Sequence, residues 1–395
     1  MCIPIFAPLR EKKIKSSFIF QYIRTTTIPT MKPIYLAFLL ITFTNSAFSQ
    51  KHPVRVGVVG LTHSHVHWIL SRPADDNMVI VGIVEPNRDL AQRYTKQHGL
   101  SMDLVYNTMK EMLSKAKPEA VMAFGTIYDH LKIVKACAPL GIHVMVEKPL
   151  AVSLDHAKKM QALAKKFHIH LLTNYETSWY PTVEKSYELL QKDSIGPLTQ
   201  MVIRDGHRGP KRINVNKEFF DWLTDPVLDG GGAITDFGCY GANISTWFHK
   251  GERPLSVTAV TQQLQKENNP KVDDEATILV LYKKSKSTIQ ASWNWPIGRK
   301  DMEVYGTTGA IFADNRNSLR VRKAVGYDGF TETSTKLEDR KFPYTDPFTL
   351  FAAVIRNEYT LPPFDLYSLE NNMIVMEILE AAKTSAKKGV TVKLK

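Results

Sequence analysis

The chain has two different patterns of apolar and polar residues, and one gives way to the other near Asn174. Before this point, short unbroken apolar runs alternate with segments in which apolar residues recur every three or four positions. Unbroken apolar strands between amphipathic helices are typical of a parallel sheet with helices on both faces. We therefore predict a doubly wound nucleotide-binding domain. Its predicted strands cover 54–59, 79–84, 120–124, 144–146 and 169–173, and its predicted helices lie near 65–72, 88–98, 108–116, 129–140 and 155–167.

After residue 174 the runs become longer and alternate apolar with polar residues. A period of two predicts strands that are buried on one face only. We expect a large, mostly antiparallel sheet with helices on one side and an open side available to a partner or a second subunit. Helical spacing of apolar residues predicts helices over 181–192 and 369–388. The predicted strands cover 198–205, 256–264, 276–282, 288–293, 302–305, 310–313 and 319–323.

The first 49 residues have the pattern of a secretory signal. Lys32 is followed by an apolar stretch over 34–41 and by the small-x-small sequence Ala47-Phe48-Ser49. A basic start, a short apolar core and such a site are typical of a cleaved signal, and the core is too short for a permanent membrane span. We expect Met31 to be the true start and the protein to be exported to a periplasmic or other extracytoplasmic compartment. An uncleaved anchor remains the alternative.

The chain is therefore an α/β protein in which a Rossmann domain precedes an α+β domain. We predict four segments: an upstream extension and signal over 1–49, an NAD(P)-binding domain over 50–173, a substrate and oligomerisation domain over 174–360, and a returning C-terminal helix over 361–395.

Charge and cysteine content exclude several classes of protein. The net charge of +12 falls to +7 without residues 1–49, which carry six Lys/Arg and one Asp/Glu. No Lys/Arg-rich run is long enough for a nucleic-acid track, so we expect no nucleic-acid partner. Only Cys137 and Cys239 remain after the signal. Two such cysteines make neither a disulfide framework nor a zinc motif.

The turn after the first strand has part of a dinucleotide-binding fingerprint. Gly60 fits the first glycine, but Thr62 and His65 stand where a glycine and a small residue are usual. The Thr62 hydroxyl, or that of Ser64, could cap the following helix and donate to a phosphate. The glycine signal alone is therefore weak.

Glu85 ends the second strand, 25 residues after Gly60. An acid at this position can accept hydrogen bonds from both ribose hydroxyls, which favours NAD over NADP. Arg88 could soften the repulsion of a 2′-phosphate, so NADP stays possible.

Three histidines, His63, His65 and His67, raise the alternative of a metal site. Residues two apart on a starting helix point in directions about 200° apart, and no set of partner ligands is evident. We therefore predict no metal, and expect His63 and His65 to cap the helix, to contact a phosphate of the nucleotide or the substrate, or to pack.

Two separate segments carry the most specific signal. Glu147-Lys148-Pro149 directly follows the fourth apolar strand, and the three glycines of 230–232 precede Asp236 and Tyr240. Together these segments resemble the glucose–fructose oxidoreductase / inositol dehydrogenase family of sugar dehydrogenases. The resemblance extends from Val54 to the C-terminus.

The resemblance implies a nucleotide domain against which the C-terminal tail packs. It implies that Gly125, Thr126 and His130, in the loop after the third strand, lie at the edge of the nicotinamide ribose; His130 more simply begins a helix. Many members of the family have histidine where Tyr240 stands, and tyrosine is the pattern of the glucose–fructose oxidoreductase branch.

Lys148, Asp236 and Tyr240 are the predicted catalytic residues. Near a positive nicotinamide, the pKa of a desolvated Lys148 should fall, so that it can take or relay a proton. Glu147 would orient the turn or the lysine, and Pro149 would fix it, through a trans or a cis bond. Asp236 and Tyr240 are four residues apart and would share one helix face. Beside the Lys148 ammonium the pKa of Tyr240 would also fall, so Tyr240 could be the base while Asp236 binds a sugar hydroxyl.

Other polar and aromatic residues near the expected crevice suit a carbohydrate, because flat rings stack on sugar C–H faces and charged groups bind hydroxyls. The predicted substrate contacts are Tyr175, Glu176, Trp179, His207, Arg208, Trp222, Asn243 and Trp295.

The leading hypothesis is an NAD(P)-dependent oxidoreductase that converts a sugar or glycoside hydroxyl into a ketone with a tightly bound, internally recycled cofactor. Two alternatives remain: an NAD-dependent glycosidase that works by transient oxidation, elimination and reduction, and a non-catalytic carbohydrate-binding protein. The predicted partners are a small carbohydrate and, through the open sheet, a second copy in a dimer or tetramer.

Overall fold

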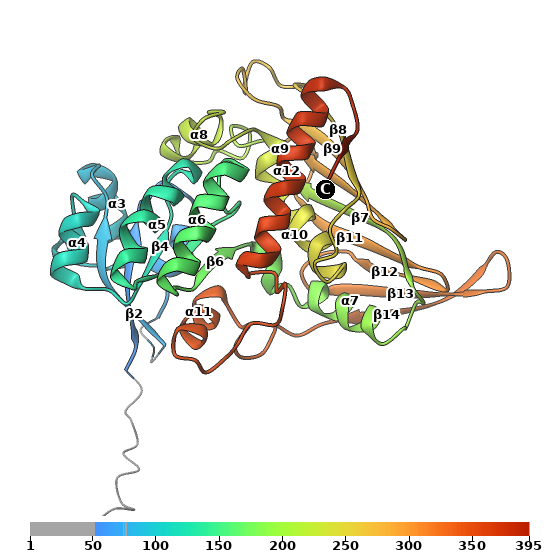
Figure 1. Ribbon diagram of the computed structural model, residues 1–395, viewed down its shortest axis with the longest axis horizontal. Helices are drawn as coiled ribbons and strands as arrows, with labels where there is room; N and C mark the ends of the chain where they lie inside the picture. Colours follow the sequence, from blue (N-terminus) through green and yellow to red (C-terminus); the bar gives the residue numbers. More distant parts are fainter. Residues whose placement is uncertain (1–51, 74, 76, 395) are drawn as a thin grey trace, which may run out of the picture. The chain divides into compact units, whose positions relative to one another are not determined.

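The computed structural model describes residues 52–73, 75 and 77–394, so the expected signal segment over 1–49 lies outside the described residues. Residues 52–395 form one compact unit that contains two sheets (Figure 1). Within its described part, no helix combines the length and the apolar character needed to span a membrane.

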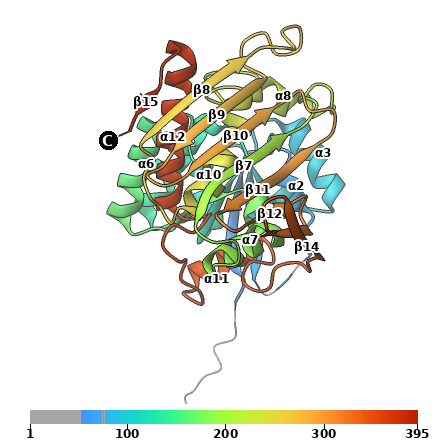
Figure 2. The ribbon, with the colours of Figure 1, turned by 90° about the vertical axis from the view of Figure 1, so that its right-hand side faces the viewer.

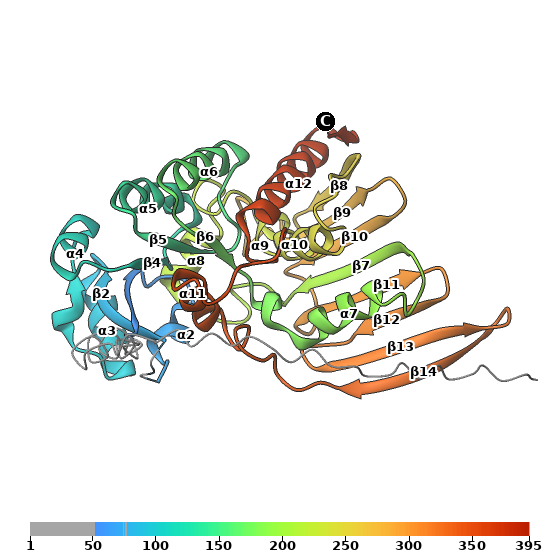
Figure 3. The ribbon, with the colours of Figure 1, turned by 60° about the horizontal axis from the view of Figure 1, so that its bottom comes forward.

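The first sheet has six parallel strands in the order β3-β2-β1-β4-β5-β6. This order, with its reversal between β1 and β4, is that of a doubly wound dinucleotide fold. Figure 3 shows α4, α5 and α6 along one face of the sheet, with α2 and α3 on the other side. The strands are β1 Val54–Val59, β2 Met78–Val84, β3 Val105–Tyr106, β4 Ala120–Ala123, β5 His143–Glu147 and β6 Leu171–Asn174. The helices are α2 Val66–Leu70, α3 Arg88–His98, α4 Met109–Ala116, α5 His130–Cys137 and α6 Leu154–Phe167.

Local signals in the sequence explain where these helices begin and end. The Asn87 side chain accepts the Leu90 N–H at the start of α3, and Gly99 ends that helix with φ 66°. Ser153 caps α6 in the same way by accepting the His156 N–H. A side-chain oxygen at the first position and a left-handed residue at the last satisfy backbone groups that the helix leaves unpaired.

The second sheet has nine strands in the order β14-β13-β12-β11-β7-β10-β9-β8-β15. All neighbouring pairs are antiparallel except β7 and β10, so the prediction of a mostly antiparallel sheet is confirmed. The strands are β7 Leu198–Gly206, β8 Ser256–Gln262, β9 Glu275–Leu281, β10 Lys286–Ser292, β11 Arg299–Gly306, β12 Gly309–Ala313, β13 Ser318–Val325, β14 Gly329–Lys336 and β15 Val392–Lys393.

Within the described part of the chain, helices cover one face of this sheet and leave the other open. Figure 2 shows the strands in front and α10 and α12 behind them. Along β9, buried Ala276, Ile278 and Val280 alternate with more exposed residues, which is the pattern of a sheet with one solvated side. The helices of this part are α7 Pro181–Gln191, α8 Lys217–Leu223, α9 Ala233–Asp236, α10 Gly238–Phe248, α11 Pro347–Ile355 and α12 Leu369–Lys388.

The C-terminal helix α12 joins the two parts of the molecule. It packs against α10 and β8 of the second part and against α6 and β6 of the first. The Lys383 ammonium donates to the carbonyls of Val152 and Gly230, at 3.1 and 3.2 Å. The tail therefore returns to the nucleotide domain as expected, but it also belongs to the core of the second part.

Candidate active site

The turn after β1 has little room for side chains. Gly60 has φ +81°, and a Cβ atom built on it would stand 2.6 Å from the Gly125 nitrogen. A side chain here would therefore collide with the turn after β4, so only glycine fits. Glu85 reaches the same turn, because its carboxylate accepts the N–H groups of Leu61 at 3.0 Å and Asn87 at 2.9 Å. The predicted ribose acid thus also holds the turn in place.

A cavity of about 1040 Å³, here called the edge cavity, opens at the carboxyl ends of β1, β2 and β4. In this topology a dinucleotide binds at these strand ends. Gly60, Val84 and Gly125 line the cavity, so its position fits a nicotinamide dinucleotide. Such a cofactor would supply a hydride acceptor or donor. The lysines that line the cavity are Lys110, Lys117, Lys132 and Lys135.

Three of the other predicted nucleotide contacts have partners within the chain. Thr126 accepts the Asp129 N–H at 3.2 Å and caps a short turn rather than facing the cavity. His130 begins α5, is fully buried, and contacts the Leu150 carbonyl through Nδ1 at 3.1 Å. Thr62 does not cap α2, since its hydroxyl accepts a hydrogen bond from Trp222 instead. Arg88 is exposed at the start of α3.

Residues 209–229, here called the crossing segment, leave the second part and pack on the nucleotide domain. The indole N–H of Trp222 donates to the Thr62 hydroxyl at 3.0 Å, next to the Gly60 turn. Three further contacts fix the segment: Asn216 Nδ2 to the Tyr94 hydroxyl at 2.8 Å, Arg93 to Glu218 at 2.6 Å, and the Tyr128 N–H to the Leu228 carbonyl at 3.0 Å. The segment therefore crosses the strand ends at which a dinucleotide binds.

Lys148 and Asp236 form a buried ion pair across the two parts of the molecule. Lys148 follows β5 and has a cis peptide bond to Pro149, while Asp236 ends α9 and also accepts the Trp293 indole N–H at 2.9 Å. Burial opposes the charge on Asp236, but the Lys148 ammonium outweighs it and lowers the pKa of the carboxyl. The two predicted catalytic groups are thus together, and both are charged.

The three glycines of 230–232 help to position Asp236, because they let the backbone come very close to neighbouring segments such as the one around Asp273. A Cβ atom on Gly232 would stand 1.9 Å from the Asp273 carbonyl oxygen. The Asp273 carboxylate accepts the N–H groups of Gly232 at 3.2 Å and Ile234 at 2.8 Å, so it holds the start of α9. Asp273 lies far away in the sequence, and no local pattern marked it.

Tyr240 does not share a helix with Asp236, because the chain breaks at Phe237 between α9 and α10. The Tyr240 ring lies near two ammonium groups, with Lys148 Nζ at 5.4 Å and Lys300 Nζ at 5.6 Å from its centroid. The Tyr175 ring meets it edge-on at 5.4 Å. Tyr240 is therefore next to the ion pair although the expected helical geometry is wrong.

The pKa values of Lys148 and Tyr240 are both raised in this arrangement of the chain's own residues. Burial would lower the pKa of Lys148, but the Asp236 carboxylate raises it above its ordinary value. Burial, with the nearby Glu176 carboxylate, raises the pKa of Tyr240 well above its ordinary value. A proton therefore stays on both groups at neutral pH.

A second cavity, here called the polar cavity, has a volume of about 810 Å³ and lies beside the ion pair. Phe237, which lines it, has its ring centroid 5.9 Å from Lys148 Nζ. Lys300 also lines the cavity and forms an ion pair with Glu176, which accepts the Tyr180 hydroxyl. The cavity thus combines aromatic faces with paired charges. The cavity is also lined by His207, Trp295 and Arg316.

Only some of the predicted substrate residues meet at this cavity. Glu176, His207 and Trp295 line it. Tyr175 lies behind Tyr240, and the Trp179 ring is edge-on to Trp68 at 5.1 Å with the Arg316 guanidinium 5.5 Å from its centroid.

Three predicted contacts lie elsewhere. The side chain of Arg208 is exposed and does not line the cavity. Trp222 belongs to the crossing segment. Asn243 is fully buried in α10 and donates to the Leu366 carbonyl at 2.8 Å, which is a packing role.

Two charged residues that the pattern did not single out lie close to these groups. Lys300 is in the ladder directly opposite Asp205. Asp205 is 1% exposed, and its two carboxylate oxygens have no hydrogen-bond partner among the described residues. Burial raises the pKa of Asp205 well above its ordinary value. Alternation along a strand predicts which side faces inward, but it does not show that an inward polar residue will meet a cavity.

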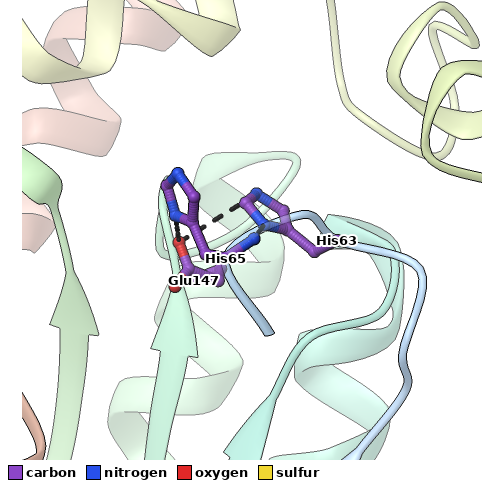
Figure 4. Close-up of side chains that lie close together, drawn as sticks. All are labelled: His63, His65 and Glu147. Atoms are coloured by element: carbon purple, nitrogen blue, oxygen red, sulfur yellow. Dashed lines mark hydrogen bonds and ion pairs between the residues drawn. The ribbon is translucent and has the colours of Figure 1, made fainter. Parts of the chain in front are cut away.

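His63 and His65 converge on Glu147 (Figure 4). They lie in the turn before α2 rather than on the helix, so the expected divergence of about 200° does not apply. His65 Nδ1 is 2.9 Å and His63 Nε2 is 4.0 Å from Glu147 Oε2. Within residues 52–394 that are described, this is the one group of three whose residue types and spacing could hold a metal ion.

Comparison with known proteins matches both parts of the chain. Residues 54–175 match a protein-family model described as "Oxidoreductase family, NAD-binding Rossmann fold", and residues 183–312 match one described as "GFO/IDH/MocA C-terminal domain". Among curated proteins, a trans-1,2-dihydrobenzene-1,2-diol dehydrogenase of Xenopus tropicalis is 27% identical over 255 residues, which cover 64% of this chain and 71% of the relative. A myo-inositol 2-dehydrogenase of Thermotoga maritima is 24% identical over 66% of this chain and 75% of the relative.

Solved structures share the fold. An aldose–aldose oxidoreductase from Caulobacter crescentus complexed with glycerol aligns with a TM-score of 0.72 at 19% identity, covering 87% of this chain and 100% of that one. An inositol dehydrogenase homologue from Azotobacter vinelandii complexed with NAD+ aligns with a TM-score of 0.74 at 17% identity, covering 88% and 98% of the two chains.

Proposed function

The chain belongs to the GFO/IDH/MocA family of NAD-binding oxidoreductases, and from that premise we propose that it oxidises a hydroxyl group of a sugar or glycoside to a ketone. The observation that carries the proposal is the Lys148–Asp236 ion pair beside the polar cavity. It lies at the end of β5, on the carboxyl edge of the sheet where the nucleotide binds.

The lining of the polar cavity supports a polyhydroxylated substrate. The Trp295 and Phe237 rings offer flat faces for C–H groups, and the Glu176–Lys300 pair offers an acceptor and a donor for hydroxyls. Burial lowers the pKa of His207 to about 4, so this imidazole is neutral at pH 7. Its Nδ1 accepts the Gly209 N–H at 2.9 Å, which leaves the proton on Nε2 to be donated to a substrate oxygen.

We also propose that the cofactor stays bound through the catalytic cycle. The crossing segment supports this idea, because its contacts with Thr62, Tyr94 and Tyr128 must open before a dinucleotide can leave the strand ends. Retention would suit the export that the signal pattern over residues 1–49 predicts, because an exported enzyme would have no cytoplasmic pool of NAD to draw on.

The experiment has two steps. Purified protein is denatured, and the released nucleotide is identified by mass and absorbance; near-stoichiometric NAD is expected, and NADP would overturn the choice of cofactor. The native protein is then mixed with methyl glycosides at a comparable concentration, so that its bound NAD is the oxidant in a single turnover, and the products are analysed by mass spectrometry. A loss of two mass units shows the keto product, whereas free sugar at an unchanged oxidation level shows the redox-neutral glycosidase. Binding of glycosides without either product would leave the carbohydrate-binding protein.

A further inference from the structure

The proposed oxidation needs a group that can accept a proton, and the raised pKa values of Lys148 and Tyr240 favour retention of the proton on both predicted bases. Lys148 is held as an ammonium by Asp236. Tyr240 keeps its proton because it is buried near Glu176. A neighbouring imidazole is a side chain suited to take the proton instead.

His65 has the geometry of a base that a carboxylate orients. Its Nδ1 is 2.9 Å from Glu147 Oε2, while Asn174 Nδ2 donates to Glu147 Oε1 at 2.8 Å. Burial raises the pKa of Glu147, whereas the nearby His63, Asn174 and Lys148 lower it. As a carboxylate, Glu147 only accepts hydrogen bonds, so the proton of His65 lies on Nδ1. The lone pair of the neutral ring is then on Nε2, and among the described residues no hydrogen bond to this atom is found. The same arrangement of carboxylate and imidazole orients the base in hydrolytic triads.

The ring of His65 is fixed, and of the three clustered side chains it is the most accessible. It stacks on Trp68 with centroids 3.7 Å apart and planes at 19°. The His63 ring lies edge-on at 4.5 Å, and His63 Nδ1 accepts the His65 backbone N–H at 3.1 Å. The side chain of His65 is 17% exposed, against 1% for those of His63 and Glu147. A reactant can therefore reach the cluster through His65.

Charged groups from the polar cavity and from the ion pair shift the pKa of His65. Glu176 and Lys300 belong to the polar cavity, and Lys148 and Asp236 form the ion pair. The carboxylate of Glu147 is in direct contact. Burial is the largest influence and lowers the pKa of His65 well below its ordinary value, which leaves the ring neutral at pH 7. His65 lines neither cavity, but in its proton-accepting form it is within electrostatic reach of the ion pair and of the Glu176–Lys300 pair.

The hydrogen bonds favour this role over a metal site at the same three residues. Ligand atoms of His63, His65 and Glu147 lie within 4.8 Å of one another. Because His63 Nδ1 already accepts the His65 N–H, the neutral His63 ring has its proton on Nε2. That atom is the one that faces Glu147 and would have to bind the ion. A metal would therefore have to displace this proton and the local hydrogen bond.

We propose that His65, oriented by Glu147, accepts the hydroxyl proton of the substrate. The O–H bond breaks and its proton goes to His65 Nε2, while the C–H bond breaks and its hydride goes to the NAD that the family binds. The O–H electron pair becomes the second bond of the ketone. This inference rests on the proposed function, since it concerns the same oxidation.

The tautomer can be tested without any substrate. Long-range ¹H–¹⁵N spectra of the ¹⁵N-labelled protein assign the His65 signals by their loss in His65→Gln. The Nδ1–H tautomer is expected, and the Nε2–H tautomer would overturn the proposal. Addition of Zn²⁺ or Mn²⁺ at one equivalent should leave the signals unchanged. A stoichiometric shift or broadening that EDTA reverses would show a metal site instead.

Chemical rescue tests the reaction itself. His65→Ala should lower the rate of methyl glycoside oxidation by about 100-fold or more, as expected for the loss of a general base, while NAD affinity changes little. Added imidazole should restore a large part of that rate. The matched control is His67→Ala, in the helix α2 that follows this turn. The His67 ring contacts His98 instead, so the variant should keep wild-type activity and show no imidazole effect.

The outcomes separate the two proposals. If the wild type binds NAD but yields no keto product, the proposed function fails and the inference falls with it, whichever tautomer the spectra show. If the wild type is active and His65→Ala keeps its rate, or loses it without rescue by imidazole, the inference fails alone.

Discussion

At the scale of single residues, the Lys148–Asp236 pair should matter for stability as well as for chemistry. Asp236→Asn would leave a buried ammonium without its counter-ion, which typically costs about 3–5 kcal/mol. We expect that loss in the free energy of unfolding, measured by urea denaturation at pH 7. Asp339→Asn, which removes the exposed partner of Arg316, should cost about 1 kcal/mol or less. Equal losses in both variants would mean that the buried pair contributes no more than a surface pair.

The pH dependence of this pair follows from its two pKa shifts. The pKa of Asp236 is lowered, so its contribution is complete above the unfolded value of 3.8 and is lost as pH falls through the folded value. The pKa of Lys148 is raised, so its contribution is complete below 10.5 and is lost as pH rises through the folded value. The pair therefore stabilises the protein throughout the neutral range.

His130 should make the protein less stable in mild acid. Burial lowers its pKa from 6.5 to about 4, so the unfolded chain binds a proton in this window while the folded chain does not. Between pH 7.5 and pH 5.0 this one group should reduce the free energy of unfolding by about 2 kcal/mol. His130→Gln keeps a donor for the Leu150 carbonyl and should flatten the pH dependence by that amount.

Urea denaturation at the two pH values measures the effect. The matched control is His168→Asn, at the exposed left-handed end of α6, where asparagine is also tolerated. In this variant the free energy of unfolding should depend on pH as it does in the wild type. An unchanged slope in His130→Gln would show that His130 is protonated in the folded protein as readily as in the unfolded one.

At the scale of elements, the crossing segment should control how fast the cofactor leaves. Trp222→Phe removes the hydrogen bond to Thr62 but keeps an aromatic ring near His63 and Phe219. A hydrogen bond worth about 1 kcal/mol corresponds to a roughly fivefold faster release of NADH. Stopped-flow fluorescence after mixing with excess NAD measures that rate. Trp247→Phe, whose ring stacks on Tyr187 at 4.0 Å, is the control and should release NADH at the wild-type rate.

Elements with a strong local pattern were predicted well. The bounds of β1, α3 and α12 agree with the sequence prediction because each has a clear apolar pattern, and the two helices also have caps. The two-residue strand β3 is too short to show a period, and every residue of β14 is exposed, so neither has a pattern to detect. The break at Phe237 between α9 and α10 was missed because Asp273, which holds the start of α9, lies 39 and 41 residues from the two N–H groups that it binds.

In the candidate site, too, the residues with a local motif were predicted and those without one were not. The segments around Lys148 and Asp236 were found because each has its own motif, and the structure brings them together. The contact between His65 and Glu147 spans 82 residues, and Lys300 meets Glu176 over 124 residues. Such pairs depend on how the strand ends and loops meet in space, so a single sequence gives no signal for them.

At the scale of the whole molecule, the open face of the second sheet should form an interface between copies of the chain. Three aliphatic side chains on adjacent strands β8 and β9 stay exposed: Val260 at 63%, Leu279 at 40% and Leu281 at 44%. A cluster of this kind is a common feature of subunit contacts, and most soluble homo-oligomers are closed symmetric assemblies. We therefore expect a dimer or tetramer by size-exclusion chromatography with light scattering.

The double variant Val260→Glu/Leu279→Lys tests that expectation. Charges in the centre of a desolvated interface are costly, so the variant should elute as a monomer with an unchanged circular dichroism spectrum. Val390→Lys, a charge placed on another exposed aliphatic residue just beyond α12, should keep the wild-type assembly. A wild-type monomer, or a double variant that assembles like the wild type, would show that this face is not the contact. The bound NAD content should be the same in every variant, because the nucleotide cleft and the crossing segment are built within one chain.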